Sequence, residues 1–143
     1  MLVRDLFENV YQLLEPTLEQ KGIALEIILK NTNLSIQADA HLLEQVLINL
    51  VLNAIEAVKD EEEPLITLSA APEGARTEIR VADNGTGMPE EILDKIFIPF
   101  FSTRKKGSGI GLSICKQIVL LHKGTLQVRS KEGEGTVFVV GVS

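Results

Sequence analysis

The sequence predicts a single domain of the α/β class. In some stretches apolar residues recur at three- and four-residue steps, which is the helical period, and in others they alternate with polar residues, which is the strand period. With 143 residues and 45% hydrophobic content, the chain can bury one substantial core. The predicted helices cover 3–20, 39–57, 90–96 and 111–121, and the predicted strands cover 23–29, 34–38, 65–71, 77–82, 125–130 and 135–142.

The first helix and strand are separated by a clear stop signal. Helical spacing of apolar residues runs through 3–20, and Lys21 and Gly22 then supply a basic last turn followed by glycine. Alternation at 23–29 indicates a strand, and 34–38 is predicted as a second, short strand.

The helix at 39–57 carries the most unusual polar pattern in the chain. It has a broad apolar stripe, and Asp39 is placed to cap its N-terminus. Asn49 and Asn53 are four residues apart, so they lie on one face, although asparagine is a mediocre helix former. Two explanations stay open: a solvated polar stripe, or a pair of amides offering oxygens to a hard cation such as Mg²⁺.

The strand at 77–82 ends in a carboxylate on its apolar side. Ile79 and Val81 share one face, and continued alternation places Asp83 on that same face. An inward-facing carboxylate without partners is costly, so Asp83 must be hydrogen-bonded. Gly85 and Gly87 follow in the next loop and allow close approach of another group to the backbone. A bland alternative is that Asp83 only caps the turn or the next helix.

A second glycine-rich segment precedes the helix at 111–121. Its Gly-x-Gly-x-Gly pattern follows a short cationic run, and a helix N-terminus beside basic residues favours phosphate. Residues 97–108 are interpreted as a lid. Ile114, Ile118 and Leu121 are predicted to face the core.

Charge and cysteine usage exclude several classes of protein. A net charge of −6 and a pI near 5.0 argue against a broad nucleic-acid or anionic-membrane surface. The single Cys115 cannot form an internal disulfide, which favours a cytoplasmic setting, and no apolar run approaches the length of a membrane span. His41 and His122 have no companions typical of a metal site, so structural or surface roles are expected.

Taken together, these segments resemble the ATP-binding domain of sensor histidine kinases, within the larger group that includes gyrase, Hsp90 and MutL. The resemblance covers nearly all of 1–143, as a single domain. The segments that resemble the family's N box, first glycine box, F box, second glycine box and last glycine box are 45–57, 83–87, 97–101, 107–112 and 133–136.

The resemblance implies a magnesium and phosphate site. Asn53 would bind Mg²⁺, with Asn49 contacting phosphate beside it, and Arg104 or Lys105 would contact the γ-phosphate. The residues expected to lie over the phosphates are Gly107, Gly109, Gly111 and Leu112.

The resemblance also implies an adenine site. Asp83 would accept a hydrogen bond from the adenine amino group, which would explain its inward-facing carboxylate. Gly85 and Gly87 would let the loop pass close to the base, Met88 would lie against the ring, and Thr136 would help hold Asp83 and the adenine.

The fold implied by the resemblance is a two-layer α/β sandwich of the Bergerat type, with a mixed, mostly antiparallel sheet and helices on one face. The hydrolytic relatives carry a glutamate base four residues before the metal-binding asparagine. Asn49 occupies that position here, and because an amide cannot take a proton, transfer to histidine is favoured over hydrolysis. Neither His41 nor His122 matches the phosphorylated histidine, so the acceptor is expected on a separate dimerisation domain.

Two alternatives share the same sequence boxes: a serine kinase of the anti-sigma-factor type and a non-catalytic nucleotide-binding module. The expected cofactors are ATP and Mg²⁺. The expected partners are the dimerisation and phosphoacceptor domain of the parent kinase and a response regulator, with no nucleic acid and no membrane contact by this domain. The domain alone is expected to be monomeric and cytoplasmic, in a parent protein that can be membrane-anchored.

Overall fold

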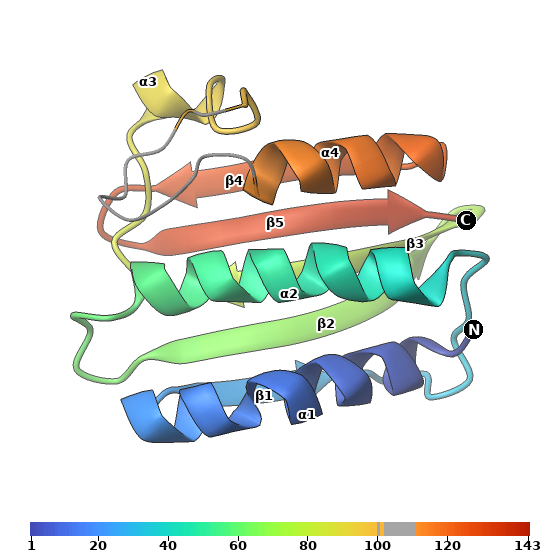
Figure 1. The fold of residues 1–143 in the computed structure, drawn as a ribbon, viewed down its shortest axis with the longest axis horizontal. Coiled ribbons are helices and arrows are strands. Elements are labelled where there is room, and N and C mark those ends of the chain that lie inside the picture. The colour runs from blue at the N-terminus through green and yellow to red at the C-terminus, as the bar shows by residue number, and fades with distance from the viewer. Residues whose placement is uncertain (100, 102–110) are drawn as a thin grey trace.

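A five-stranded sheet with helices packed on one face forms the domain (Figure 1). The computed structural model describes residues 1–99, 101 and 111–143. The elements in chain order are α1 (Val3–Lys21), β1 (Ala24–Ile28), α2 (Ala40–Ala57), β2 (Leu65–Glu73), β3 (Arg76–Asp83), α3 (Glu90–Leu93), α4 (Gly111–Leu121), β4 (Thr125–Lys131) and β5 (Gly135–Val142).

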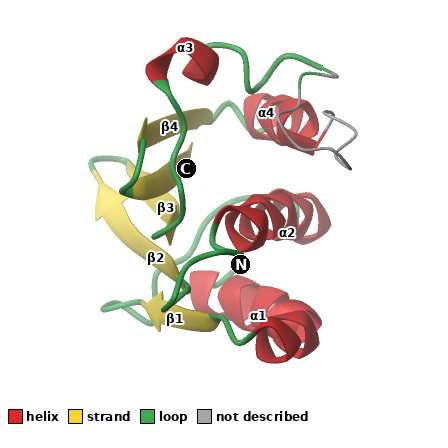
Figure 2. Cartoon of the chain, turned by 90° about the vertical axis from the view of Figure 1, so that its left-hand side faces the viewer, coloured by secondary structure: helices red, strands yellow, loops and turns green. Residues whose placement is uncertain are grey.

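The strands follow the order β1-β2-β3-β5-β4. β1 pairs parallel with β2, and the other neighbouring strands pair antiparallel. Figure 2 shows α1, α2 and α4 together on one side of the sheet, and none of the helices in the described residues covers the other side. This arrangement confirms the predicted mixed, mostly antiparallel sheet with helices on one face.

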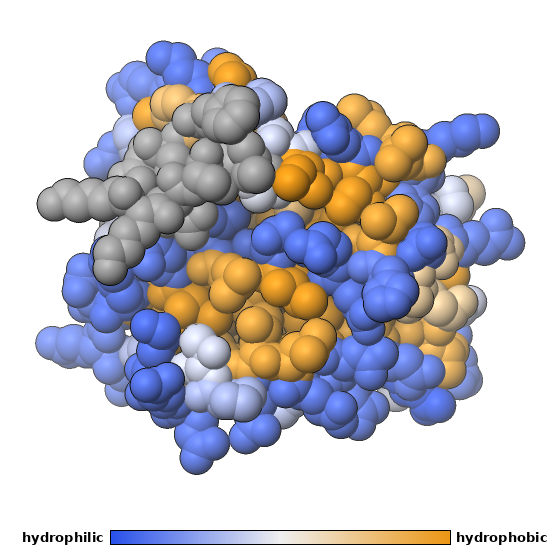
Figure 3. Space-filling model, viewed as in Figure 1, coloured by the Kyte–Doolittle hydropathy of each residue, from blue (hydrophilic) through white to orange (hydrophobic). Residues whose placement is uncertain are grey.

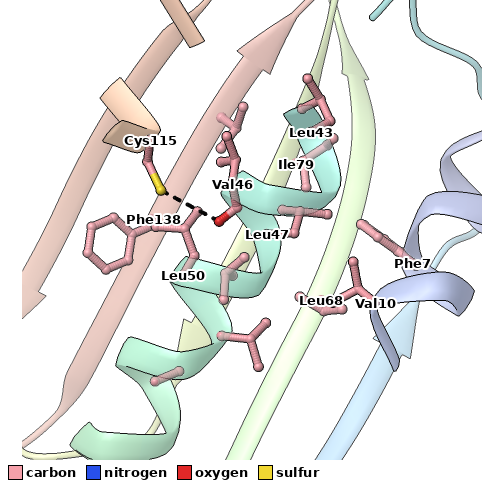
Figure 4. Close-up of a cluster of buried hydrophobic side chains, with 14 of the residues drawn as sticks. Phe7, Val10, Leu43, Val46, Leu47, Leu50, Leu68, Ile79, Cys115 and Phe138 are labelled. Carbon is pink, nitrogen blue, oxygen red and sulfur yellow. Dashed lines mark hydrogen bonds between the residues drawn. The ribbon is translucent and has the colours of Figure 1, made fainter. Parts of the chain in front are cut away.

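The core lies between the sheet and α2, with α1 and α4 on either side (Figure 4). Leu43, Leu47 and Leu50 of α2 are fully buried over the sheet, as the predicted apolar stripe requires. Burying one such side chain contributes about 1.5–3 kcal/mol to the free energy of unfolding. Directly paired residues point to the same face of a sheet. Two helix-facing rows follow from the pairing, one of Leu68, Val81, Phe138 and Val128, the other of Ala70, Ile79, Val140 and Leu126.

The predicted stop of α1 and the predicted N-cap of α2 are confirmed, and His122 has a structural role. The Asp39 carboxylate accepts from the Leu42 N–H at 3.0 Å and caps α2, and Gly22 ends α1 in the left-handed conformation, with φ 68°. His122 Nε2 lies 3.1 Å from the Asp39 backbone nitrogen, which donates to it. Its Nδ1 lies 2.8 Å from the Ile118 carbonyl, so this ring joins the end of α4 to the start of α2.

The strand predicted at 34–38 does not form. The backbone of this segment bonds instead to the start of the chain, where Ile36 N–H donates to Met1 and Val3 N–H donates to Leu34, at 2.9 and 3.0 Å. Only one isolated bridge, between Leu2 and Ser35, results. The prediction rested on a short segment that follows a turn, but a strand also needs a partner long enough to continue the ladder. The helix predicted at 90–96 is also shorter and ends at Leu93.

The predicted inner face of α4 is partly wrong. Ile118 is buried, but Ile114 and Leu121 are exposed, and Cys115 and Val119 face the core in their place. Apolar residues occur on several sides of α4, so their spacing does not identify one buried face. Apolar surface also shows on the helical side of the molecule, along α4 and between α1 and α2 (Figure 3). The exposed large apolar side chains of these helices are Tyr11, Leu13, Leu52, Ile114, Leu120 and Leu121.

Candidate functional site

A row of polar side chains lies at one end of the helix-facing side of the sheet. Asp83 pairs with Ile66 on one side and with Thr136 on the other, and Thr136 pairs with Ser130. Because paired residues share a face and Ile66 is fully buried beneath the helices, the three polar side chains face inward as well. The apolar core therefore ends in a polar row at this end of the sheet.

The Asp83 carboxylate accepts hydrogen bonds from the backbone of two segments, the loop after β3 and strand β5. It accepts from the Gly85 N–H at 2.9 Å and from the backbone of Thr136. Burial raises the pKa of the Asp83 carboxyl above its usual range, these hydrogen bonds counteract part of the rise, and Glu61 adds to it. The predicted inward placement of a hydrogen-bonded Asp83 is confirmed. The carboxylate keeps lone pairs available for a further donor.

The loop after β3 is held between α2 and the turn joining β4 to β5. The Thr86 N–H donates to the Ala57 carbonyl at 3.2 Å, and the Gly133 N–H donates to the Thr86 carbonyl at 2.7 Å. A Cβ at Gly85 would overlap the Ala57 carbonyl, and one at Gly87 would overlap the Lys131 carbonyl. These glycines are therefore required by close packing within the chain, whether or not a ligand is bound.

Replacing Gly87 with alanine is expected to destabilise the domain by about 2 kcal/mol. Its φ is 70°, and the added methyl group would meet the backbone of Lys131. Urea unfolding measures the loss. Gly74→Ala is the matched control, because Gly74 has φ 61° with no atom within 4 Å of the added Cβ. Equal losses in the two variants would show that only the backbone conformation matters at Gly87.

Ser130 was not among the residues predicted from the sequence, although the structure places it in the polar row. Its hydroxyl accepts from the Met88 N–H at 2.8 Å and lies 2.7 Å from Thr136 Oγ1. The available signal was the alternation in β4, where Leu126 and Val128 share a face with Ser130. That pattern, apolar residues followed by one polar residue at the strand's end, matches the pattern that identified Asp83.

The N-terminal end of α4 approaches the asparagine face of α2. An ideal Cβ on Gly111 would lie 3.8 Å from Asn49 Oδ1, so the two helices meet here. Asn49 and Asn53 are partly buried, as is Leu112 beside Gly111. The predicted Arg104, Lys105, Gly107 and Gly109 lie outside the described residues and stay predictions, as does most of the lid predicted at 97–108.

Cys115 of α4 contacts Val46 of α2 (Figure 4). Its thiol donates to the Val46 carbonyl at 3.7 Å. Burial raises the pKa of this thiol to about 12, and hydrogen bonding from the Asn49 side chain partly offsets the rise. Asn49 is thereby held from the α4 side.

The Cys115 thiol is expected to resist thiol reagents at pH 8 in the folded domain, because the thiolate is the reactive species and burial disfavours it. Release of the chromophore from Ellman's reagent, with and without denaturant, measures this. Because the folded pKa lies above the ordinary 9.0, stability from this group is full below pH 9 and falls as pH rises toward about 12. Rapid stoichiometric labelling without denaturant would contradict the prediction.

Phe97, the first residue of the predicted F box, is anchored to the core. Its ring makes an edge contact with Phe138 at 6.4 Å between centroids. Lys116 Nζ lies 5.4 Å from the Phe97 ring centroid and donates to the Leu126 carbonyl at 3.2 Å. Lys116 was not predicted from the sequence. The aromatic segment therefore begins from a fixed point between α4 and β5.

Known proteins resemble this chain in both sequence and structure. Residues 38–143 match the family described as histidine kinase-, DNA gyrase B-, and HSP90-like ATPase. The sensor histidine kinase ZraS of Escherichia coli (strain K12) is 39% identical over 138 residues, which cover 96% of this chain and 29% of that protein. The chain thus spans less than a third of the length of this relative.

Solved histidine kinase structures superpose closely. The nucleotide-free catalytic domain of ThkA gives a TM-score of 0.87 at 36% identity, over 98% of this chain and 92% of that one. Full-length ShkA in complex with AMPPNP gives 0.86 at 28% identity, over 98% of this chain and 29% of that one. ThkA has also been solved with the response regulator TrrA. The chain therefore belongs to the family of histidine kinase-, DNA gyrase B- and HSP90-like ATPases.

Proposed function

We propose that this domain binds Mg-ATP between α2, the start of α4 and the polar row of the sheet. It then transfers the γ-phosphoryl group to a histidine on a separate dimerisation and phosphoacceptor domain. This transfer is one step of two-component signal transduction, and the phosphoryl group passes on to a response regulator.

The placement of Asp83 carries this proposal. An ionised carboxylate that faces inward with free lone pairs offers a strong acceptor to a ligand amino group. Asp83 is fixed by backbone bonds from Gly85 in the loop after β3 and from Thr136 on β5, so it is oriented before a ligand arrives. An adenine base supplies such an amino group and a flat apolar ring, which can lie near the partly buried Met88.

The face of α2 fits a magnesium ion shared with phosphates. Among the residues that the structure describes, no group of three or more His, Cys, Asp or Glu could hold a metal. Asn53 instead offers an amide oxygen one helical turn from Asn49, and Mg²⁺ commonly takes few protein ligands together with phosphate oxygens and water. When bound, the ion would neutralise charge on the transferring phosphoryl group. Arg104 or Lys105 is proposed to contact the γ-phosphate.

Asn49 favours transfer to a nucleophile over rapid hydrolysis. Its amide cannot accept the proton of an attacking water, and it lies against Gly111 and Cys115, which offer no base to replace it. Imidazole needs less activation because it is itself a good nucleophile. The domain's task is then to position the γ-phosphoryl group for an acceptor that arrives from outside.

The relatives support the proposed ligand and partners. ShkA was solved with AMPPNP and ThkA with a response regulator, and both superpose on nearly all of this chain. No helix in the described part of the chain is long and apolar enough to cross a membrane. We place the domain in the cytoplasm, monomeric when alone and working on the phosphoacceptor domain of its parent.

Radiolabelled phosphotransfer tests the proposed function. The domain is mixed with Mg-[γ-³²P]ATP and the separately purified histidine-bearing domain of the parent kinase. We expect label on that domain that is acid-labile and alkali-stable, as for phosphohistidine, and no label when the acceptor histidine is alanine. Acid-stable label on serine would favour the serine-kinase alternative, and ATP binding without transfer to any acceptor would favour the nucleotide-sensing module.

A further inference from the structure

The Ser130 hydroxyl is a junction between three parts of the chain. It accepts the Met88 N–H from the loop after β3, at 2.8 Å. It also lies 3.1 Å from the Gly135 carbonyl and 2.7 Å from Thr136 Oγ1 on β5. Ser130 is partly buried, and Thr136 is 5% exposed. Each contact is therefore partly shielded from water.

Counting protons shows that these contacts admit two arrangements. Ser130 has one hydroxyl proton and can give it either to the Gly135 carbonyl or to Thr136 Oγ1. In the first arrangement Thr136 gives its own proton to Ser130 and offers only lone pairs to its surroundings. In the second arrangement Ser130 donates to Thr136, and the Thr136 proton is free for another acceptor.

The second arrangement complements an adenine edge. Asp83 and Thr136 are directly paired on neighbouring strands, so their side chains lie next to each other on the inward face. Asp83 when ionised offers only acceptors. Adenine presents an amino donor beside ring-nitrogen acceptors, so it needs an acceptor and a donor side by side. By donating to Thr136 Oγ1, Ser130 fixes the direction in which the remaining Thr136 proton points.

We propose that Ser130 is a positioning residue for base recognition, which directs the Thr136 proton toward the base while fixing the backbone at Met88. The inference rests on the proposed function, because it assumes that a nucleotide base binds beside Asp83. Ser130 acts through Thr136 and Met88. Its removal should therefore change selectivity among bases more than the affinity for triphosphate.

Nucleotide analogues provide the test. Binding of ATP, 1-deaza-ATP and 7-deaza-ATP is measured by calorimetry, since each analogue replaces one ring nitrogen beside the amino group with a CH group. The wild-type domain is expected to bind one of the two analogues, the one that lacks the ring nitrogen contacted by Thr136, about fivefold more weakly than ATP. A fivefold loss is the effect of one neutral hydrogen bond. Ser130→Ala is expected to weaken ATP binding about fivefold more than it weakens binding of that analogue.

Matched variants separate positioning from a general structural effect. Ser69→Ala, a serine on β2 paired with Arg80 away from the polar row, should change neither affinity. Thr136→Val should remove the same discrimination, and adding Ser130→Ala to it should not change the ratio of the affinities for ATP and that analogue any further, because the lost Met88 contact affects both ligands alike. Should Ser130→Ala fail to fold, Ser130→Cys keeps the volume with only a weak donor and is expected to show the same loss.

The outcomes distinguish this inference from the proposed function. Equal weakening of ATP and both analogues in Ser130→Ala would overturn the positioning role, as would a wild-type domain that discriminates against neither analogue. In both cases ATP binding itself would persist and the proposed function would stand. Absence of ATP binding by the wild-type domain would instead overturn the proposed function.

Discussion

Replacing Asp83 with asparagine is expected to weaken ATP binding about 10- to 100-fold. A hydrogen bond to a charged acceptor contributes about 1.5–3 kcal/mol, and the variant also turns one acceptor of the side chain into a donor. That donor would face either the base or the backbone N–H groups of Gly85 and Thr136, which now donate to the carboxylate. Calorimetric titration with Mg-ATP measures the change, and equal affinities for both proteins would contradict the assigned role.

Asp60→Asn is the control for this experiment, because Asp60 is an exposed carboxylate just beyond α2.

The pH dependence of stability and of ATP binding gives a second test of the role of Asp83. Since its pKa is raised, the folded domain holds this proton more tightly than the unfolded chain does. The stability that the group contributes therefore rises as pH falls between the ordinary and the raised pKa. ATP affinity should fall over the same interval, and this dependence should be absent in Asp83→Asn.

Replacing Asn53 with alanine is expected to reduce magnesium-dependent phosphotransfer about 100-fold or more. Loss of a partner outside the ligand shell already costs about 10- to 100-fold in metal affinity, and Asn53 is proposed as a direct ligand. The rate of transfer to the phosphoacceptor domain, measured across a magnesium titration, gives the effect. Nucleotide binding without metal should change by less than about twofold, because the adenine contacts remain.

Gln45→Ala provides the comparison for Asn53. Gln45 is an exposed amide two helical turns earlier in α2, so its loss tests the effect of altering that helix alone. It should leave the magnesium titration unchanged. An Asn53→Ala domain with the wild-type magnesium dependence would place the metal elsewhere.

Periodicity was sufficient for most of the fold because the strongest patterns were long. The stripe on α2 and the alternation through β2 and β3 gave the correct elements and the inward side of Asp83. It failed where the pattern was short or uniform. The segment at 34–38 alternates but bonds to Met1 and Val3, and α4 is apolar on several sides, so its buried face was misplaced.

The sequence indicated some residues of the candidate site but none of the connections between them. Asp83 and the asparagine pair were visible as polar residues within apolar patterns. The packing of Gly87 against Lys131, the contact of Cys115 with Asn49 and the junction at Ser130 join segments far apart in the chain. Such contacts depend on the order of strands and helices, which no local pattern contains.

The pairing of Asp83 with Thr136 makes recognition a property of strand alignment. Side chains alternate between faces, so a single inserted residue between Thr136 and Val137 would turn Thr136 away from Asp83 if the remainder of β5 kept its partners. The same insertion within 132–134 would only lengthen a turn. Two insertion variants of the same length would then differ in whether the side chains of Asp83 and Thr136 lie next to each other. The tolerance of this chain to insertions is therefore expected to change abruptly at Gly135.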